Sequence, residues 1–371
     1  METTACRWGI VGTAGIARKN WRAIANSGNG TLIAVASRSA ERAAQFVAEC
    51  QSDVPFLKQP EAVAGYDALL ARDDIDAVYI PLPTGIRKEW VIRAAEAGKH
   101  VVCEKPCGLS AVDVAEMLEA CKQANVQFMD GVMFMHSRRL QVMREILDER
   151  TSVGEIRRIS ARFSFRAPDD FLQSNIRVSS ELEPLGCLGD LGWYTVRFAL
   201  WAMSYELPEQ VTGRILSQFG RADSPQPVPT EFSGELIFPG GASSGFYCSF
   251  LANHDQHATI SGANGYLHVP DFVLPFSGDE TSFDIEQNEF VVRGCNFEKQ
   301  RHSRRIAVPE HSHGHPDSQE TNLFRRFGEL VLSGHPDPFW GQIALKTQQV
   351  LDACMQSANN NGQPVSPTSN L

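Results

Sequence analysis

A lysine that directly follows a buried strand is the residue whose placement most suggests chemistry. The stretch HVVCEKPCGLS, which begins at residue 100, passes from apolar residues to Glu104, Lys105 and Pro106. Three interpretations are open: a metal or redox site built on the flanking cysteines, a structural ion pair, or a lysine placed for catalysis. Cys103 and Cys107 are four residues apart, which matches no common zinc or redox motif, so plain buried thiols are favoured.

A second group of polar residues lies in LGCLGDLGWYTVRFALW, residues 185–201. Asp190 and Tyr194 are four apart in a predicted helix, so their side chains project from one face. The simpler interpretation is an aspartate that complements the helix dipole and a half-buried tyrosine. Taken alone, the pair fits this simpler interpretation better. Tyrosine has a reference pKa of about 10, and a lysine ammonium within hydrogen-bond reach would favour the tyrosinate.

The stretch GIVGTAGIARK lies between the first predicted strand and the first helix, where a dinucleotide-binding loop belongs. Small residues let the backbone approach a pyrophosphate at the helix N-terminus. Read as G-x-G-x-x-A, the loop has alanine in place of the middle glycine. The expected cofactor-binding residues of this loop are Gly12, Thr13, Ala14, Gly15 and Ile16.

The end of the second predicted strand, VASRSAER, indicates which dinucleotide binds. NAD-binding loops usually place Asp or Glu there, whereas this chain has Ser37, Arg38 and Ser39. A guanidinium and two hydroxyls suit a 2′-phosphate, so NADP is predicted and NAD remains possible. A solvated surface arginine is the alternative interpretation.

Alternating strand and helix patterns over residues 1–130 predict a dinucleotide-binding domain with a parallel sheet covered on both faces. From residue 131 to 371, segments of alternating polarity separated by Gly, Pro and Asn predict a mainly antiparallel sheet with one buried face. Two helices close the chain, at about 317–333 and 341–358, and the last could pack back on the first domain. The second domain is expected to bind substrate and to form the oligomer.

Composition excludes several classes of function. The chain has 371 residues, a net charge of −10 and no apolar run of about 20 residues, which argues against nucleic-acid and membrane partners. Nine cysteines without an export signal predict reduced thiols and a cytoplasmic location. The run HSHGHP, with His311, His313 and His315, could suggest a metal. A flexible loop is favoured and no metal is expected, because no other matching ligands were identified.

Together these motifs resemble the glucose-fructose oxidoreductase, inositol dehydrogenase and MocA family. The glycine loop, IPLPT (80–84), GKHVVCEKP (98–106) and the Asp-x-x-x-Tyr helix carry the resemblance, which covers nearly the whole chain. The chain looks most like the branch with dimeric dihydrodiol dehydrogenase and NADP-linked xylose dehydrogenase. The resemblance implies a Rossmann domain and a C-terminal domain with a large open sheet. It also implies a cis bond before Pro106.

The resemblance implies hydride transfer between NADP and a secondary CH–OH group of a sugar, polyol or cyclic diol. Lys105 is expected beside the nicotinamide and the substrate hydroxyl, with Asp190 orienting the substrate and Tyr194 exchanging the proton; Lys105 itself is the alternative acid-base. Glu104 is expected to shape the turn and contact the cofactor. Further cofactor residues are expected at Pro81, Leu82, Pro83 and Thr84, and substrate residues at His136, Arg177 and Trp193.

Two other functions remain open within this resemblance. Some relatives hold NAD tightly and cleave glycosides, and at least one is a non-catalytic dinucleotide-binding regulator. The chain also departs from the family where Thr84-Gly85-Ile86-Arg87 replaces Asn-x-x-His and Met135 replaces a common arginine. These departures leave the substrate open. A homodimer through the open sheet is expected, because large apolar patches are rarely left exposed.

Overall fold

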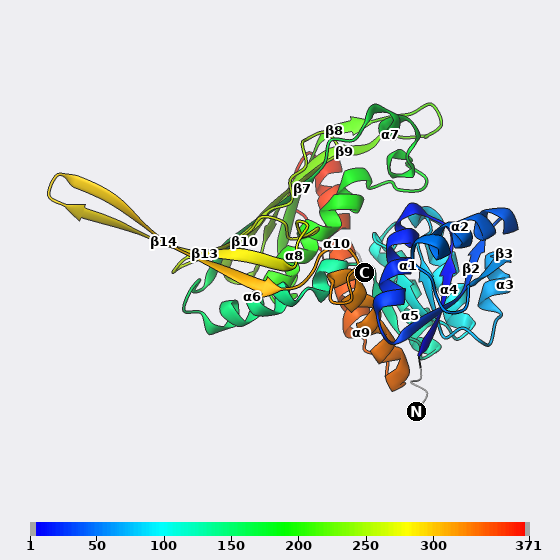
Figure 1. Ribbon diagram of the computed structural model, residues 1–371. Helices are drawn as coiled ribbons and strands as arrows, with labels where there is room; N and C mark the ends of the chain where they lie inside the picture. The colour runs from blue at the N-terminus through cyan, green and yellow to red at the C-terminus, as the bar shows by residue number, and fades with distance from the viewer. Residues whose placement is uncertain (1–4, 368–371) are drawn as a thin grey trace.

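The computed structural model describes residues 5–367 and contains two sheets, one in each half of the chain (Figure 1). The first sheet has six parallel strands in the order β3-β2-β1-β4-β5-β6. This order is that of a dinucleotide-binding Rossmann sheet. Its strands are β1 (Cys6–Val11), β2 (Gly30–Ser37), β3 (Glu61–Ala64), β4 (Ala77–Ile80), β5 (His100–Cys103) and β6 (Phe128–Asp130).

Helices connect these strands and cover both faces of the sheet. They are α1 (Gly15–Asn26), α2 (Ala40–Asp53), α3 (Tyr66–Leu70), α4 (Thr84–Glu96) and α5 (Ala111–Gln123). The strands consist mainly of buried Val, Ile, Ala and Cys, because a parallel sheet is covered on both sides. The expected fold class of this half is confirmed.

The second sheet has eight strands in the order β14-β13-β12-β11-β7-β10-β9-β8. Neighbouring strands are antiparallel except β7 and β10, so the sheet is mainly antiparallel, as expected. Its strands are β7 (Ile156–Ser164), β8 (Gln210–Phe219), β9 (Val228–Ile237), β10 (Ser243–Ser249), β11 (Ala258–Gly262), β12 (Tyr266–Val269), β13 (Glu280–Arg293) and β14 (Asn296–Pro309).

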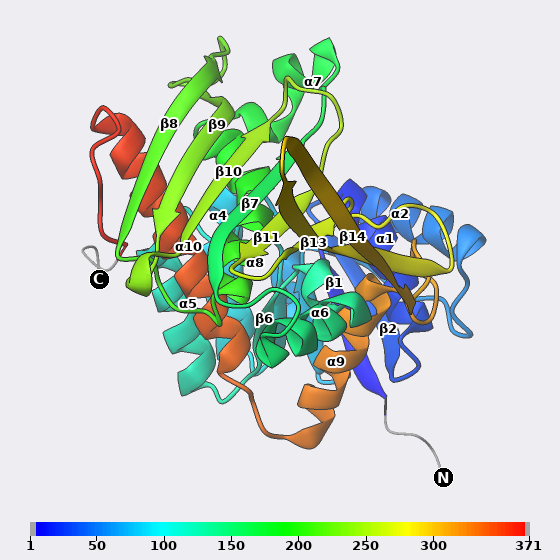
Figure 2. The same cartoon turned by 90° about the vertical axis from the view of Figure 1, so that its left-hand side faces the viewer.

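Helices lie on one face of this sheet only (Figure 2). Buried aromatic and aliphatic residues of β7, β9 and β10 pack there against α8 and α10. The remaining elements of this half are α6 (Arg138–Glu149), α7 (Asp169–Ser174), α8 (Trp193–Ala202), α9 (Gln319–Ser333), α10 (Phe339–Asn359), the 3₁₀ turns η1 (Met133–His136), η2 (Ile176–Val178) and η4 (Pro239–Gly241), and the π-helical turn η3 (Leu188–Gly192).

The uncovered face of the second sheet differs from what the sequence suggested. It forms a shallow groove of about 430 Å³ lined mainly by polar side chains, among them Arg158, Arg162, Arg214 and Glu235. Strand alternation directs the apolar residues of the same strands toward the helices. The expectation of a large exposed apolar patch on this sheet was therefore wrong.

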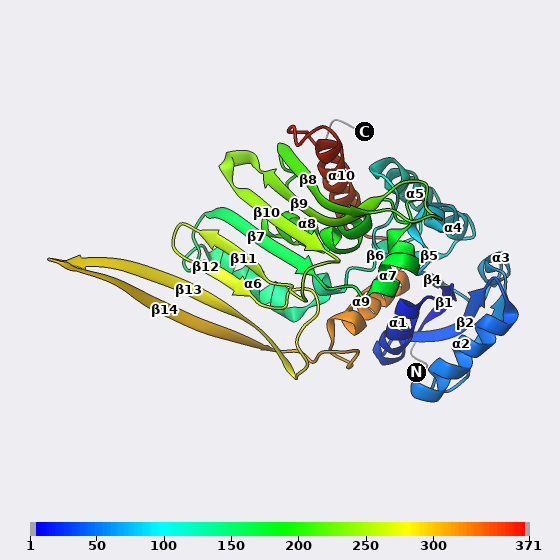
Figure 3. The ribbon, with the colours of Figure 1, turned by 90° about the horizontal axis from the view of Figure 1, so that it is seen from above.

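The two C-terminal helices join the halves of the molecule. Helix α9 packs on α1 and on β1, where Phe324 and Phe327 of the helix lie 5.1 and 5.2 Å from the ring of Trp8. Helix α10 contacts β8 and α8 on one side and α5 and β6 on the other (Figure 3). The last helix thus packs back on the Rossmann sheet, which fixes the cleft between the halves.

Strands β13 and β14 continue beyond the sheet as a long two-stranded arm (Figures 1 and 3). Its outer part exposes the apolar side chains of Phe290, Val292 and Phe297. An isolated two-stranded ribbon is marginally stable in water, and exposed aromatic residues add to that instability. Within residues 5–367, no helix is both long and apolar enough to cross a membrane.

Candidate active site between the two sheets

A cavity of about 790 Å³ lies between the glycine loop, the ends of β4 and β5, and the start of α8. In the sheet order, β1 is flanked by β2 on one side and β4 on the other, so the chain reverses its direction of winding there. Such a switch point leaves a crevice beyond the carboxyl ends of the strands. The second half of the chain closes this crevice with side chains from β7, η2 and η3.

The turn after β5 directs Lys105 into this cavity. Tyr79 donates a hydrogen bond of 2.6 Å to Glu104 Oε1, and the backbone amide of Lys105 donates one of 3.1 Å to Glu104 Oε2. The Lys105–Pro106 peptide bond is cis, as the resemblance implied. Glu104 holds the turn from inside and also lines the cavity.

Arg87 stabilises the same turn from the other side. Its Nε donates to the carbonyl of Leu82 at 2.9 Å, and a terminal nitrogen donates to the carbonyl of Pro106. The arginine is buried. It therefore ties the turn after β4 to the turn that carries Lys105.

Asp190 lies at the start of the helical segment that leads into α8 and forms ion pairs with two cationic side chains. Lys105 Nζ donates to Asp190 Oδ1 and to its carbonyl, both at 2.7 Å, and Arg177 Nε donates to Oδ2 at 2.8 Å. Burial alone would raise the pKa of Asp190, but Arg177 and Lys105 outweigh burial and hold this pKa well below its usual value. The carboxylate is ionised and bridges the two cations.

Tyr194 lies against the same lysine. Lys105 Nζ is 4.7 Å from the centre of the phenol ring, and the hydroxyl donates a weak contact of 3.7 Å to Met133 Sδ. Burial, followed by the charges of Glu104 and Asp190, raises the pKa of Tyr194 well above 10. The sequence interpretation, in which lysine favours a tyrosinate, is corrected: the phenol keeps its proton.

The segment containing Asp190 is a π-helical turn, Leu188–Gly192, that continues as α8. A wider turn still places residues four apart on nearly the same side, so Asp190 and Tyr194 both meet Lys105. Single π turns are frequent at functional sites. Lys105, Asp190, Tyr194 and Arg177 all line the one cavity.

The residues at the first strand–helix turn fit a dinucleotide. Helix α1 begins at Gly15 after Ala14, which has no side chain to cap it, so its first amides face the cavity. Gly12 has φ of 115°, and a Cβ there would lie 2.9 Å from Leu82. Of the expected cofactor residues, the structure brings to the cavity wall Ala14, Gly15, Ile16, Pro81, Leu82, Glu104 and Lys105. Gly12, Thr13, Pro83 and Thr84 lie beside these residues in the chain but outside the lining.

Ser37 and Arg38 lie at the end of β2, next to β1 in the sheet. Ser37 is buried and Arg38 is exposed, while the Ser39 hydroxyl accepts from the Arg42 amide and caps α2. Among the described residues, neither Arg38 nor Arg42 has an ion-pair partner within 4.0 Å. Two guanidinium groups without an ion-pair partner, just after β2 and in the first turn of α2, match a 2′-phosphate.

Two of the three expected substrate residues are corrected by their packing. Trp193 has no exposed surface, and its indole donates to Asp130 at 3.3 Å. His136 stacks on Trp340 with ring centres 4.6 Å apart. Neither side chain lines the cavity, because their neighbours hold them in the interior. Arg177 does line it.

The sequence interpretation missed several cavity residues from the second half. Glu183 accepts from the Thr84 amide at 3.0 Å and from its hydroxyl at 2.7 Å. Phe163, Phe165 and Phe171 form an aromatic wall. Phe163 and Phe165 lie two apart in or directly after an alternating strand, a signal that marks a shared face but not the cavity.

Comparison with known proteins gives matches over most of the chain. The model described as the oxidoreductase family with an NAD-binding Rossmann fold, Gfo/Idh/MocA, matches residues 6–132, and the Gfo/Idh/MocA C-terminal domain model matches residues 140–268.

Individual relatives cover similar parts of the chain. A dTDP-3,4-didehydro-2,6-dideoxy-alpha-D-glucose 3-reductase of Streptomyces violaceoruber is 34% identical over 76% of this chain and 78% of its own. The D-xylose 1-dehydrogenase (NADP(+)) 2 of Haloferax volcanii is 32% identical over 71% of this chain and 75% of its own. A 3-ketoreductase from Actinomadura kijaniata, solved with NADP and TDP-benzene, superimposes with a TM-score of 0.77 at 26% identity, covering 95% of this chain and 98% of that one.

Proposed function

The chain belongs to the Gfo/Idh/MocA family of oxidoreductases. From that membership we propose that it transfers hydride reversibly between NADP and a secondary CH–OH group of a sugar, polyol or cyclic diol. The observation that carries this proposal is the convergence of Lys105, Asp190 and Tyr194 in one cavity beside the glycine loop. Lys105 lies 85 residues before Asp190 and 89 before Tyr194 in the sequence. A purely structural ion pair would not require a tyrosine and a dinucleotide loop at the same place.

Tyr194 is the proton donor for reduction of a carbonyl and the acceptor for oxidation of the alcohol. When bound, NADP supplies or accepts the hydride. The raised pKa of Tyr194 keeps the phenol neutral, which is the form that donates a proton to a developing alkoxide. Lys105 adds a positive charge 4.7 Å from the ring and stabilises negative charge on either oxygen.

Asp190 positions the cationic groups rather than exchanging protons. Its pKa is held well below the usual value, so it does not take up a proton near neutral pH. Each carboxylate oxygen accepts from one cation, which fixes the Lys105 ammonium at the cavity wall. The third ammonium proton can then be donated to a substrate oxygen.

NADP is favoured over NAD by the end of β2. Arg38 and Arg42 are exposed, and no carboxylate stands at the position where NAD-binding loops place one. The relatives named above include an NADP-linked dehydrogenase and a ketoreductase solved with NADP. Both support the same cofactor here.

The substrate class follows from the cavity and the relatives. Charged and amide groups at one end suit hydroxyl and carbonyl oxygens, while the wall of Phe163, Phe165 and Phe171 suits an apolar sugar face or an aryl group. Relatives act on a dTDP-linked keto sugar and on xylose. A glycoside-cleaving enzyme with permanently bound NAD is the second candidate, and it is favoured only if the purified protein retains NAD.

We also infer a homodimer in a reducing compartment such as the cytoplasm. The arm formed by β13 and β14 exposes Phe290, Val292 and Phe297 and needs a cover, for which a second copy of the chain is available. All nine cysteines lie within the described residues and none forms a disulfide. Sedimentation at micromolar concentration, compared with Phe290→Ser/Phe297→Ser, tests the dimer: a monomeric parent protein contradicts it.

A screen of keto sugars, sugars and diols with NADPH, NADP, NADH and NAD, followed by absorbance of the reduced nicotinamide, tests the reaction. Turnover with NADP and loss of turnover in Tyr194→Phe are expected. Cleavage of aryl glycosides without net change in absorbance would support the second candidate. Binding of dinucleotide without turnover on any substrate would support a regulatory protein instead.

A further inference from the structure

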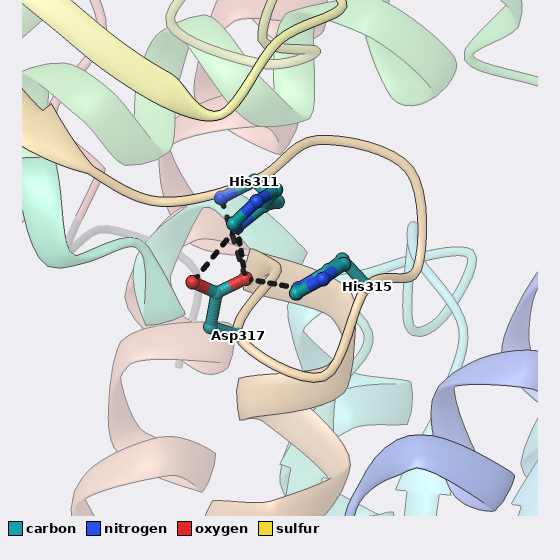
Figure 4. A group of neighbouring side chains, drawn as sticks. All are labelled: His311, His315 and Asp317. Atoms are coloured by element: carbon teal, nitrogen blue, oxygen red, sulfur yellow. Dashed lines mark hydrogen bonds and ion pairs between the residues drawn. The ribbon is translucent and has the colours of Figure 1, made fainter.

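The loop between β14 and α9, residues 310–318, carries a cluster that the proposed reaction does not use. His311, His315 and Asp317 converge there (Figure 4). His311 Nδ1 lies 3.0 and 3.1 Å from the two oxygens of Asp317, and His315 Nδ1 lies 2.6 Å from Oδ1. Within residues 5–367, this is the one group of three or more His, Cys, Asp or Glu side chains whose ligand atoms gather within 4.8 Å.

We propose that His311, His315 and Asp317 bind one divalent transition-metal cation of the Zn²⁺ class. Two imidazole nitrogens and a carboxylate oxygen form a ligand set that suits Zn²⁺, with water in a fourth position. Metal–ligand bonds of about 2.0–2.2 Å place neighbouring ligand atoms of a tetrahedral site roughly 3.3 Å apart. The nitrogen–oxygen distances of 2.6–3.1 Å are therefore within about 1 Å of those that a cation requires.

The two imidazole rings must turn for the cation to enter. They are stacked with centres 3.7 Å apart and planes 16° from parallel, so their nitrogen lone pairs run side by side instead of meeting. The second side-chain torsion of histidine is broad, so such a rotation costs little. The side chains of His311 and His315 are 41% and 47% exposed, which leaves room for rotation and a path for the ion.

The backbone of the loop is already held in shape. His313 and Gly314 adopt φ of 61° and 70°, which folds the chain back between the two ligating histidines. Asn26 of α1 donates to the Gly314 carbonyl at 2.6 Å, and Asn322 of α9 donates to the Asp317 carbonyl at 3.2 Å. Little ordering remains to be done when the ion binds, which favours affinity.

The Asp317 carboxylate lies between the two imidazoles. In the metal-free form its Oδ1 makes hydrogen bonds with His311 Nδ1 at 3.0 Å and with His315 Nδ1 at 2.6 Å. A cation would replace those hydrogen bonds and compensate the charge directly.

The position of the cluster indicates a structural role. None of the three ligands lines the active-site cavity. Asp317 precedes Ser318, which caps α9, and Glu320 in the first turn of α9 forms an ion pair with Lys19 at the cavity wall. A bound ion would clip the end of β14 to the start of α9 and so fix a helix that borders the cofactor cleft.

Titration calorimetry with ZnCl₂ on untagged protein, stripped with EDTA and then desalted, tests the site. All proteins carry Cys295→Ser, because Cys295 is the exposed thiol. The parent is expected to bind one Zn²⁺ per chain. His315→Ala and Asp317→Asn are each expected to weaken binding at least tenfold. His313→Ala is the matched control, because this exposed histidine of the same loop lies outside the cluster, and it should bind as the parent does.

Co²⁺ gives an independent readout through visible absorption of a nitrogen- and oxygen-ligated ion, which should disappear in His311→Gln. Circular dichroism and melting curves verify that each variant is folded. Absence of saturable Zn²⁺ binding by the parent would overturn the proposal. So would equal binding by His315→Ala, Asp317→Asn and the parent, because the ion would then lie elsewhere.

Discussion

Replacement of Lys105 by methionine separates a catalytic lysine from a structural one. The substitution retains the apolar stem and removes two hydrogen bonds of 2.7 Å that Nζ donates to Asp190. Hydrogen bonds to charged groups contribute about 1.5–3 kcal/mol each. Asp190 keeps Arg177 on its other oxygen, so we expect a net loss of about 2 kcal/mol. For a chain of 371 residues that corresponds to a fall in melting temperature of about 3 °C, which leaves a folded protein.

The effect on turnover should be much larger than the effect on stability. Removal of a group that stabilises the developing charge or takes part in proton transfer costs about 10²–10⁴ in rate. We expect kcat of Lys105→Met to fall by that factor in steady-state assays of NADPH oxidation. The dissociation constant for NADPH, measured by fluorescence, should change less than about threefold, because the proposed mechanism places Lys105 beside the reacting end of the cofactor only.

Lys99→Met is the matched control at the other end of β5. Its ammonium is buried and donates to the carbonyls of Arg72 and Ile75 at 2.6 and 2.9 Å, far from the cavity lining. This variant should lose similar stability, about 1–3 kcal/mol, while keeping kcat within about twofold. Equal loss of activity in both variants, or parental kcat in Lys105→Met, would refute the catalytic assignment.

Three further outcomes are expected. Because burial and the nearby carboxylates raise the pKa of Tyr194, the rate of carbonyl reduction should be independent of pH from about 6 to 9, and the rate of alcohol oxidation should rise with pH. A reduction rate that falls near pH 7 would contradict this. Tyr194→Phe should lower kcat about 10²–10⁴-fold without changing the melting temperature. Arg38→Ala should reduce the preference for NADPH over NADH about tenfold or more in binding assays, whereas Arg93→Ala on α4 should leave it unchanged. Asp190 has a lower pKa in the folded protein than in the unfolded chain, so the stability that it contributes is present above the unfolded pKa of about 3.9 and is lost as pH falls through the lower folded pKa. The difference in melting temperature between Asp190→Asn and the parent should therefore be constant from pH 5 to 8 and shrink in stronger acid.

The Rossmann half could be predicted well because its signals are local. Short buried runs such as those of β1 and β5 alternate with helical periodicity, and glycine and proline mark their ends. The elements that were missed, β3 (Glu61–Ala64) and α3 (Tyr66–Leu70), are only four and five residues long, so they carry little periodicity. The alternation of β7 predicted a strand with one buried face, but no local pattern indicates which strand will be its neighbour.

Site residues that depend on local signals could likewise be predicted from the sequence, whereas those that depend on tertiary contacts could not. Lys105 could be predicted from the strand that carries it, since parallel strands deliver their ends to one edge of the sheet. The sequence alone could not exclude Trp193 from the substrate site, because the residue beside a catalytic tyrosine can face either the cavity or the core. Its orientation depends on Asp130, which lies 63 residues earlier on β6. Arg177 lines the cavity, but its contact with Asp190 is a tertiary one that spacing does not reveal.

The state of Tyr194 shows why identity and spacing are not sufficient for a mechanism. From the sequence, a lysine near a tyrosine favours the tyrosinate, because only that one charge is known. In the structure the Lys105 ammonium forms an ion pair with Asp190, whose own negative charge also acts on Tyr194. Burial and the charge of Glu104 then dominate and raise the pKa of Tyr194. The carboxylate that positions the lysine adds to these two larger effects, so Asp190 also helps to keep the tyrosine protonated.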